Sequence, residues 1–121
     1  MEIRDTGIDE VVIDFKALHH IMTEANFVIG EHWDYERVTY DYKVGSTEEN
    51  ITYYIRVQGY ALEGDVDRGD AVLKLLPPLL GKHYYPTGIE YGEDERFPSS
   101  LITRATKMLK NVGEKLESFK K

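Results

Sequence analysis

Apolar side chains recur with two different spacings along the chain, and each spacing predicts a different kind of element. Steps of three and four residues are typical of a helix with one apolar face. They occur in residues 16–26, which predicts a first helix. Asp14 is the expected N-cap, and Asn26 is the expected terminator because asparagine tolerates the left-handed conformation that ends many helices.

The same helical spacing returns in residues 99–119 and predicts a longer, C-terminal helix. Ser99 or Ser100 is the expected cap. Gly113 lies inside this helix, at a cost of about 1 kcal/mol relative to alanine. A close approach between the helix and the sheet would explain the glycine.

Between the two helices the spacing changes to period two, which predicts strands. The predicted strands are residues 9–15, 27–35, 38–44, 51–57 and 71–76. Ala61 and Leu62 extend the fourth of these after a kink at Gly59. Pro77 and Pro78 end the ladder of the fifth, because proline has no N–H to donate. Residues 79–98 contain no periodic element and are expected to form a long irregular segment.

The resulting order, β-α-β-β-β-β-α, predicts an α+β domain with an antiparallel curved sheet that grips the long C-terminal helix. This is the topology of TATA-binding-protein-like folds, and the name of the fold carries no implication of DNA binding. No repeat or linker interrupts the pattern, so we expect residues 1–121 to form one domain.

The composition excludes several classes of function. The chain has no cysteine, which excludes disulfides, thiolate metal sites and a thiol nucleophile. Its net charge of -7 argues against nucleic acid as a partner, because phosphate binding needs an excess of Lys and Arg. Without an 18-residue apolar run or a signal-like N-terminus, we expect a cytoplasmic protein that does not bind membranes.

The charge is unevenly distributed along the chain. Residues 99–121 contain six Lys or Arg against two Glu, whereas the remainder is strongly acidic. We therefore expect basic side chains of the last helix to help it dock on the acidic body, at tenths of a kcal/mol per exposed pair.

No catalytic or metal-binding motif is present. The four serines lie outside any Gly-x-Ser-x-Gly turn, and the acidic segment 63–70 does not fit the register of a calcium-binding loop. A metal site would require His32 and His83 to meet near a carboxylate such as Asp34 or Glu90. We predict no catalytic residue, no metal and no cofactor.

One strand carries a polar row opposite its apolar row. Tyr54, Arg56, Gln58 and Tyr60 share one face of the strand, and Thr39, Asp41 and Lys43 are expected on the same face of its neighbour. Two interpretations are open: a solvent-exposed face, or a binding surface. The second interpretation is supported by the enrichment of Tyr and Arg at interface hot spots.

Several segments resemble the YugN-like proteins of Bacillus and its relatives. They are residues 27–30, 32–36, 40–43, 54–57, 59–67 and 79–84, which include the Trp33-Asp34-Tyr35 and Gly81-Lys82-His83-Tyr84 blocks. The resemblance covers about residues 8–97 and implies a small α+β domain. The family is uncharacterised, so it implies no catalytic or binding residue.

Together these observations predict a non-catalytic binding or protein-interaction domain, with a homodimer as one form of that function. The partner is an unknown small molecule or protein. The expected binding residues are Trp33, Tyr35, Tyr54, Arg56, Tyr60, His83 and Tyr84. The alternative is a small hydrolase, isomerase or metal-dependent enzyme that uses His83 with Asp34, Asp41 or Glu90 as acid, base or ligand.

Overall fold

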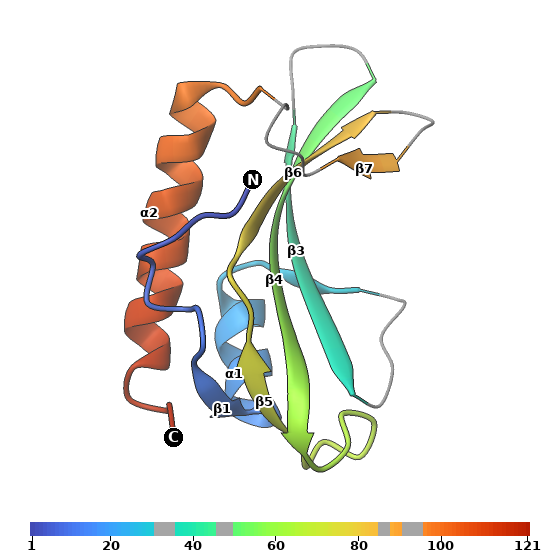
Figure 1. The fold of residues 1–121 in the computed structure, drawn as a ribbon, viewed down its shortest axis with the longest axis vertical. Coiled ribbons are helices and arrows are strands. Elements are labelled where there is room, and N and C mark those ends of the chain that lie inside the picture. Colours follow the sequence, from blue (N-terminus) through green and yellow to red (C-terminus); the bar gives the residue numbers. More distant parts are fainter. Residues whose placement is uncertain (31–35, 46–49, 85–87, 91–95) are drawn as a thin grey trace.

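The computed structural model describes residues 1–30, 36–45, 50–84, 88–90 and 96–121. Within them the chain forms a curved antiparallel sheet of seven strands, with both helices on the same side of the sheet (Figure 1). The elements are β1 (Val12–Asp14), α1 (Phe15–Glu24), β2 (Val28–Ile29), β3 (Arg37–Gly45), β4 (Ile51–Glu63), β5 (Val72–Leu75), β6 (Leu79–Tyr84), β7 (Gly88–Glu90) and α2 (Ser99–Leu116). The predicted fold class, an antiparallel sheet that grips a C-terminal helix, is confirmed.

β4 is the central strand of the sheet. One edge pairs with β3 along nine residues. The other edge pairs with β6 over Ile51–Arg56 and with β5 over Gly59–Glu63. Residues 76–78 separate β5 from β6, because Pro77 and Pro78 cannot donate to a ladder. The two short strands therefore share one edge of β4, and the sheet continues beyond the prolines.

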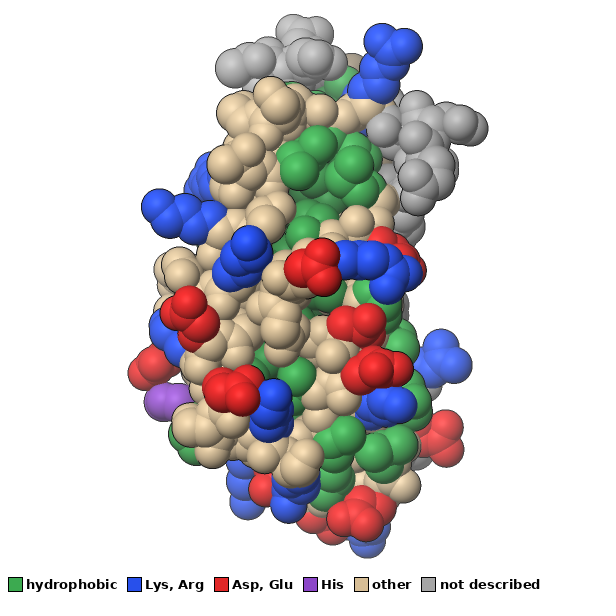
Figure 2. All heavy atoms as spheres, turned by 60° about the vertical axis from the view of Figure 1, so that its left-hand side comes forward, with side chains coloured by type: hydrophobic (Ala, Val, Ile, Leu, Met, Phe, Trp, Pro, Cys, Tyr) green, Lys and Arg blue, Asp and Glu red, His purple; other side chains and the backbone are tan. Residues whose placement is uncertain are grey.

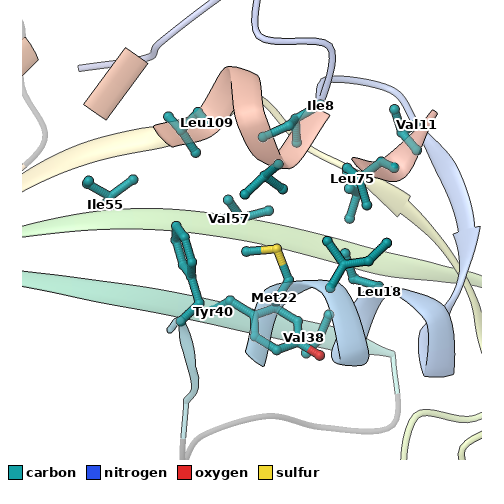
Figure 3. Close-up of a cluster of buried hydrophobic side chains, with 14 of the residues drawn as sticks. Ile8, Val11, Leu18, Met22, Val38, Tyr40, Ile55, Val57, Leu75 and Leu109 are labelled. Carbon is teal, nitrogen blue, oxygen red and sulfur yellow. The ribbon is translucent and has the colours of Figure 1, made fainter. Parts of the chain in front are cut away.

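The core fills the space between the sheet and the two helices. Leu109 of α2 and Leu18 and Met22 of α1 converge there on side chains from the strands (Figure 3). The fully buried side chains from β3 and β4 are Val38, Tyr40, Ile55 and Val57. Since these four lie on one parity of their strands, the core side of the sheet follows directly from the alternation in the sequence.

The N-terminal segment, residues 1–11, packs against α2 and the edge of the sheet. The N–H of Ile3 donates to the carbonyl of Pro78 at 2.9 Å, and the N–H of Leu80 donates to the carbonyl of Met1 at 2.8 Å. Ile3, Ile8 and Val11 belong to the core. The segment therefore covers the break between β5 and β6 and adds apolar area under α2.

Gly113 lies where this segment crosses α2. A Cβ atom at Gly113 would lie 2.0 Å from the carbonyl oxygen of Thr6 and 3.3 Å from Cα of Gly7, which itself has φ +83°. The predicted close approach is confirmed, but the partner is the N-terminal segment and not the sheet. Nothing in the local sequence pattern marks residues 6 and 7 as that partner.

The ends of the helices correct one prediction and support another. Asp14 is the N-cap of α1 without a side-chain hydrogen bond. Asn26 has φ 67°, and the N–H groups of Asn26 and Phe27 donate to Thr23 and Met22, which completes a Schellman motif. The predicted serine cap of α2 is wrong. Pro98 is the N-cap, its carbonyl accepts from Leu101 and Ile102, and Ser99 is already helical.

Two predictions about the strands also need correction. Residues 79–98 are not uniformly irregular, since they contain β6 and β7. The irregularity in β4 lies between Ala61 and Glu63, and the strand passes Gly59 without a shift in register. The predicted strand 27–35 begins with β2, and residues 31–35 of that prediction lie outside the described residues. Gly81 conceals the period of β6, which is defined by its pairing with β4.

Within the described part of the chain, one basic side chain of residues 99–121 forms an ion pair with the acidic body. Figure 2 shows Lys or Arg side chains intermingled with Asp or Glu side chains over the molecule's surface on the α2 side. Lys121 Nζ lies 3.4 Å from Asp14 Oδ1, and Lys120 pairs with Glu117 within the C-terminal segment. Arg104 contacts the ring of Tyr42, 5.9 Å from its centroid.

We predict that Gly113→Ala lowers the free energy of unfolding by about 3 kcal/mol, because the new methyl group overlaps backbone atoms that cannot move independently. Chemical denaturation of both proteins measures the difference. Gly45→Ala is the matched control, since no described atom lies within 4 Å of its added Cβ. It should change stability by less than about 1 kcal/mol. Equal effects of the two substitutions would contradict the close contact at Gly113.

The buried hydroxyl of Thr6 provides a second prediction. Its Oγ1 has no hydrogen-bond partner among the described residues, and the side chain is buried. Thr6→Val keeps the shape and removes the unsatisfied hydroxyl, so we expect a gain of about 1 kcal/mol in denaturation experiments. Thr103→Val, on the exposed surface of α2, is the control and should give no gain. A loss of stability on Thr6→Val would show that the hydroxyl is satisfied.

Candidate binding surface on the sheet

The face of the sheet away from the helices, here called the outer face, gathers polar and aromatic side chains from four strands. The register places Arg37 opposite Tyr60, Thr39 opposite Gln58, Asp41 opposite Arg56, and Lys43 opposite Tyr54. Lys74 of β5 and His83 of β6 lie opposite Tyr60 and Thr52 on the other edge of β4. The predicted sharing of one face by these rows of β3 and β4 is confirmed.

A bidentate ion pair occupies the middle of the outer face. Nε and Nη2 of Arg56 donate to the two carboxylate oxygens of Asp41 at 2.7 and 2.8 Å. The side chains are 20% and 21% exposed, so the pair is only partly screened by water. Two parallel charge-assisted hydrogen bonds hold both groups in one geometry. The centre of the face is therefore rigid and internally neutralised.

Aromatic and amide side chains flank this pair along β4. The ring of Tyr54 meets that of His83 edge-on, with centroids 6.2 Å apart. Gln58 Nε2 donates weakly to Thr39 Oγ1 at 3.4 Å. Tyr54, Gln58 and Tyr60 are all half-buried. They lie beside one another on a pleated surface and present rings and hydrogen-bonding groups outward.

The charge of the outer face is opposite in sign to that of the whole chain. In the rows described above it carries the cations Arg37, Lys43, Arg56 and Lys74 and the single carboxylate Asp41. The chain as a whole has a net charge of -7.

Tyr40, whose pKa is clearly shifted, lies in the core and not on the outer face. Burial raises the pKa of Tyr40 well above the usual tyrosine range. Its hydroxyl hydrogen-bonds to His19 Nδ1 at 2.9 Å, and its side chain has no exposed surface. A phenol held neutral inside the core stabilises the fold and is out of reach of a substrate.

The structure brings together four of the seven expected binding residues. Tyr54, Arg56, Tyr60 and His83 all lie on the outer face. Trp33 and Tyr35 lie outside the described residues. Tyr84 belongs to β6, and its side chain is likewise outside the description.

If the protein were an enzyme that uses His83, the expected partners of His83 would be Asp34, Asp41 and Glu90, and the structure describes the side chain of Asp41 among them. Asp34 and the side chain of Glu90 lie outside the description, and Asp41 is engaged by Arg56. Within the described part of the chain, no group of three His, Asp or Glu side chains is arranged to hold a metal ion.

Three residues of the outer face were missed in the sequence: Arg37, Lys74 and Leu76. Arg37 precedes the clean alternation of β3, and Leu76 follows the end of β5. Their proximity to Tyr60 depends on the registers of two ladders, which no local pattern specifies. The available signals were the parity of Arg37 with Thr39 and the alternation of Lys74 and Leu76 with Leu73 and Leu75.

Comparisons with known proteins agree on one family. The model of the YugN-like family matches residues 4–116. The chain is 41% identical over 118 residues to the uncharacterized protein YlbA of Bacillus subtilis (strain 168), across 98% of this chain and 97% of that protein. It is 47% identical, with a TM-score of 0.83, to the crystal structure of the uncharacterized conserved protein YugN from Geobacillus kaustophilus HTA426, across 98% and 96% of the two chains. None of the described helices is long and apolar enough to cross a membrane.

We predict that Asp41→Asn and Arg56→Gln each lower the free energy of unfolding by about 1–2 kcal/mol, because each leaves a partly buried charge without its partner. The double variant should lose less than the sum of the two single losses, with a coupling energy of about 1 kcal/mol in urea denaturation. Lys43→Gln, an exposed neighbour, is the control and should stay within about 0.5 kcal/mol. Strict additivity would contradict the geometry of the pair.

Proposed function

The chain belongs to the YugN-like family, and we propose that this member is a non-catalytic binding domain that holds an acidic segment of a partner protein on its outer face. The observation that carries the proposal is the charge of that face. Lys43 and Lys74 lie on it although the chain is acidic overall. Complementary charge steers association and suppresses partners of the wrong sign.

The side chains between the cations suit a protein partner. Tyr54 and Tyr60 are large and have few rotatable bonds, so they lose little entropy when a partner packs on them. Half-burial already restricts them before binding. The neutralised pair of Asp41 and Arg56 between them offers fixed hydrogen-bonding groups rather than a mobile charge. These features support recognition of a particular partner as well as general attraction to acidic chains.

A second copy of this chain is the less favoured occupant. A symmetric dimer through the outer face would bring together two copies of the same positively charged patch, which includes Lys43 and Lys74, since a two-fold interface joins identical patches. Like charges facing one another oppose association. Light scattering that gave twice the 14.0 kDa mass of the monomer, with the dimer lost on charge reversal at Lys43, would favour the homodimer and contradict the acidic partner.

The enzyme alternative has less support. The imidazole of His83 packs against the ring of Tyr54, and Asp41 already accepts two hydrogen bonds from Arg56. A general base has to reach the proton that it removes directly or through one water. An Asp41 carboxylate held by a guanidinium is a poor candidate for that role.

We predict that poly-L-glutamate binds the full chain and shifts the backbone amide resonances of β3 and β4, whereas poly-L-lysine does not bind the outer face. Charge reversal at Lys43 and Lys74 together should weaken binding at least about tenfold, because it removes two favourable charges and adds two repulsive ones. Added salt should weaken binding as well. Two-dimensional NMR titration and calorimetry measure these effects.

Charge reversal at Lys107 and Lys110 is the matched control, because it changes the net charge equally on the exposed surface of α2. It should leave most of the affinity intact. Equal losses in both double variants would reduce the effect to net charge and contradict a site on the outer face. Preferential binding of single-stranded oligothymidylate would contradict a protein partner and point to nucleic acid stacked on the tyrosines.

A further inference from the structure

The outer face is hollowed where β3 begins, at the end of the sheet that lies lowest in Figure 1. The hollow is a pocket of about 300 Å³. Two cross-strand pairs form its walls, Arg37 with Tyr60 and Thr39 with Gln58. Val38 and Gly59 lie between these pairs on the opposite parity, so they contribute backbone to the pocket. Leu76, whose N–H donates to the carbonyl of Gln58, borders the remaining side.

We propose that this pocket binds a small organic acid, with the carboxylate held by Arg37 and an apolar or aromatic body against Tyr60 and Leu76. The guanidinium of arginine presents a planar fork of donors that matches a carboxylate. The hydroxyls of Thr39 and Tyr60 and the amide of Gln58 are within the same walls and supply further polar contacts. The inference goes beyond an acidic protein partner, because it assigns a small-molecule site.

A carboxylate fits this pocket better than a phosphate group. Phosphate carries nearly two negative charges and is commonly bound by several cations or by a run of free backbone N–H groups. Arg37 is the cation among the residues that line the pocket. The lining segments of β3 and β4 are extended strands and not the kind of turn that makes successive backbone N–H groups converge on an anion. One cation matches a single negative charge.

The remaining lining residues determine the size and polarity of the part of the ligand that is attached to the carboxylate. Leu76 is 39% exposed, which makes it one of the more exposed large apolar side chains in the described part of the chain. Covering it would remove apolar surface from water. The ring of Tyr60 is half-buried and adds a second apolar surface. A volume of about 300 Å³ is at the lower limit of ordinary ligand pockets, so the ligand is small.

Benzoate is the probe that tests this site on the full chain. Benzamide is its neutral analogue, and acetate is a carboxylate without the aromatic ring. We expect benzoate to shift the amide resonances of residues 37–39, 58–60 and 76. Benzamide and acetate should each bind at least about tenfold more weakly, because each lacks one half of the recognised chemistry. Two-dimensional NMR titrations give the affinities and the location together.

Arg37→Gln should weaken benzoate about tenfold and leave benzamide unchanged, whereas Lys107→Gln, which removes one positive charge on α2, should change neither. Leu76→Asp should abolish benzoate binding by placing a carboxylate at the rim. Both substitutions are at exposed positions, so the fold is kept and the unperturbed part of the spectrum verifies it.

Two results would overturn the proposal. One is equal affinity for benzoate and benzamide, and the other is benzoate binding that Arg37→Gln does not weaken. Failure of the pocket is distinguishable from failure of the protein-binding function. If no small probe binds but poly-L-glutamate still shifts residues near Lys43 and Lys74, the pocket alone is rejected. If benzoate binds and poly-L-glutamate does not, the acidic protein partner alone is rejected.

Discussion

The alternation of side chains along β4 is the constraint on which the rest of the structure depends. Successive residues of a strand point to opposite faces, so one run of sequence builds both the core and the outer face. Ile55 and Val57 are fully buried under the helices, while Arg56 and Gln58 between them face outward. A shift of register by one residue would exchange the two rows, burying charges and exposing the core. The stability of the core thus holds the outer face in its arrangement.

The packing of α2 depends on a contact between backbone segments. Backbone meets backbone where Thr6 and Gly7 cross Gly113, and no side chain fits between them. That approach lets the N-terminal segment reach both the helix and the break between β5 and β6. Ile3 and Ile8 of this segment are buried in the hydrophobic core. The glycine that weakens α2 as an isolated helix therefore allows the packing that stabilises it in the fold.

How much of this was predictable from the sequence depends on the range of the interaction responsible. The two helices and the strands β3 and β4 follow from local spacing, and so does the grouping of Tyr54, Arg56 and Tyr60 on one face. β6 was missed because Gly81 interrupts its alternation and its strand character comes from pairing with β4. The contact at Gly113 and the pocket between Arg37 and Leu76 depend on residues far apart in sequence. Local patterns therefore predicted faces, whereas contacts between elements required the three-dimensional structure.

The positions of the charges on the outer face determine how it can bind a partner. Asp41 neutralises Arg56 at the centre, while Lys43 and Lys74 lie towards the margins of the described face. Marginal charges mainly affect the rate and salt dependence of association, whereas a fixed, hydrogen-bonded centre restricts which partner fits. Had Asp41 been absent, the face would be a general attractor for anions. The ion pair limits the attraction to the margins and leaves tyrosine rings and amides at the middle. This arrangement suits selective binding better than a uniformly solvated surface or a reactive centre.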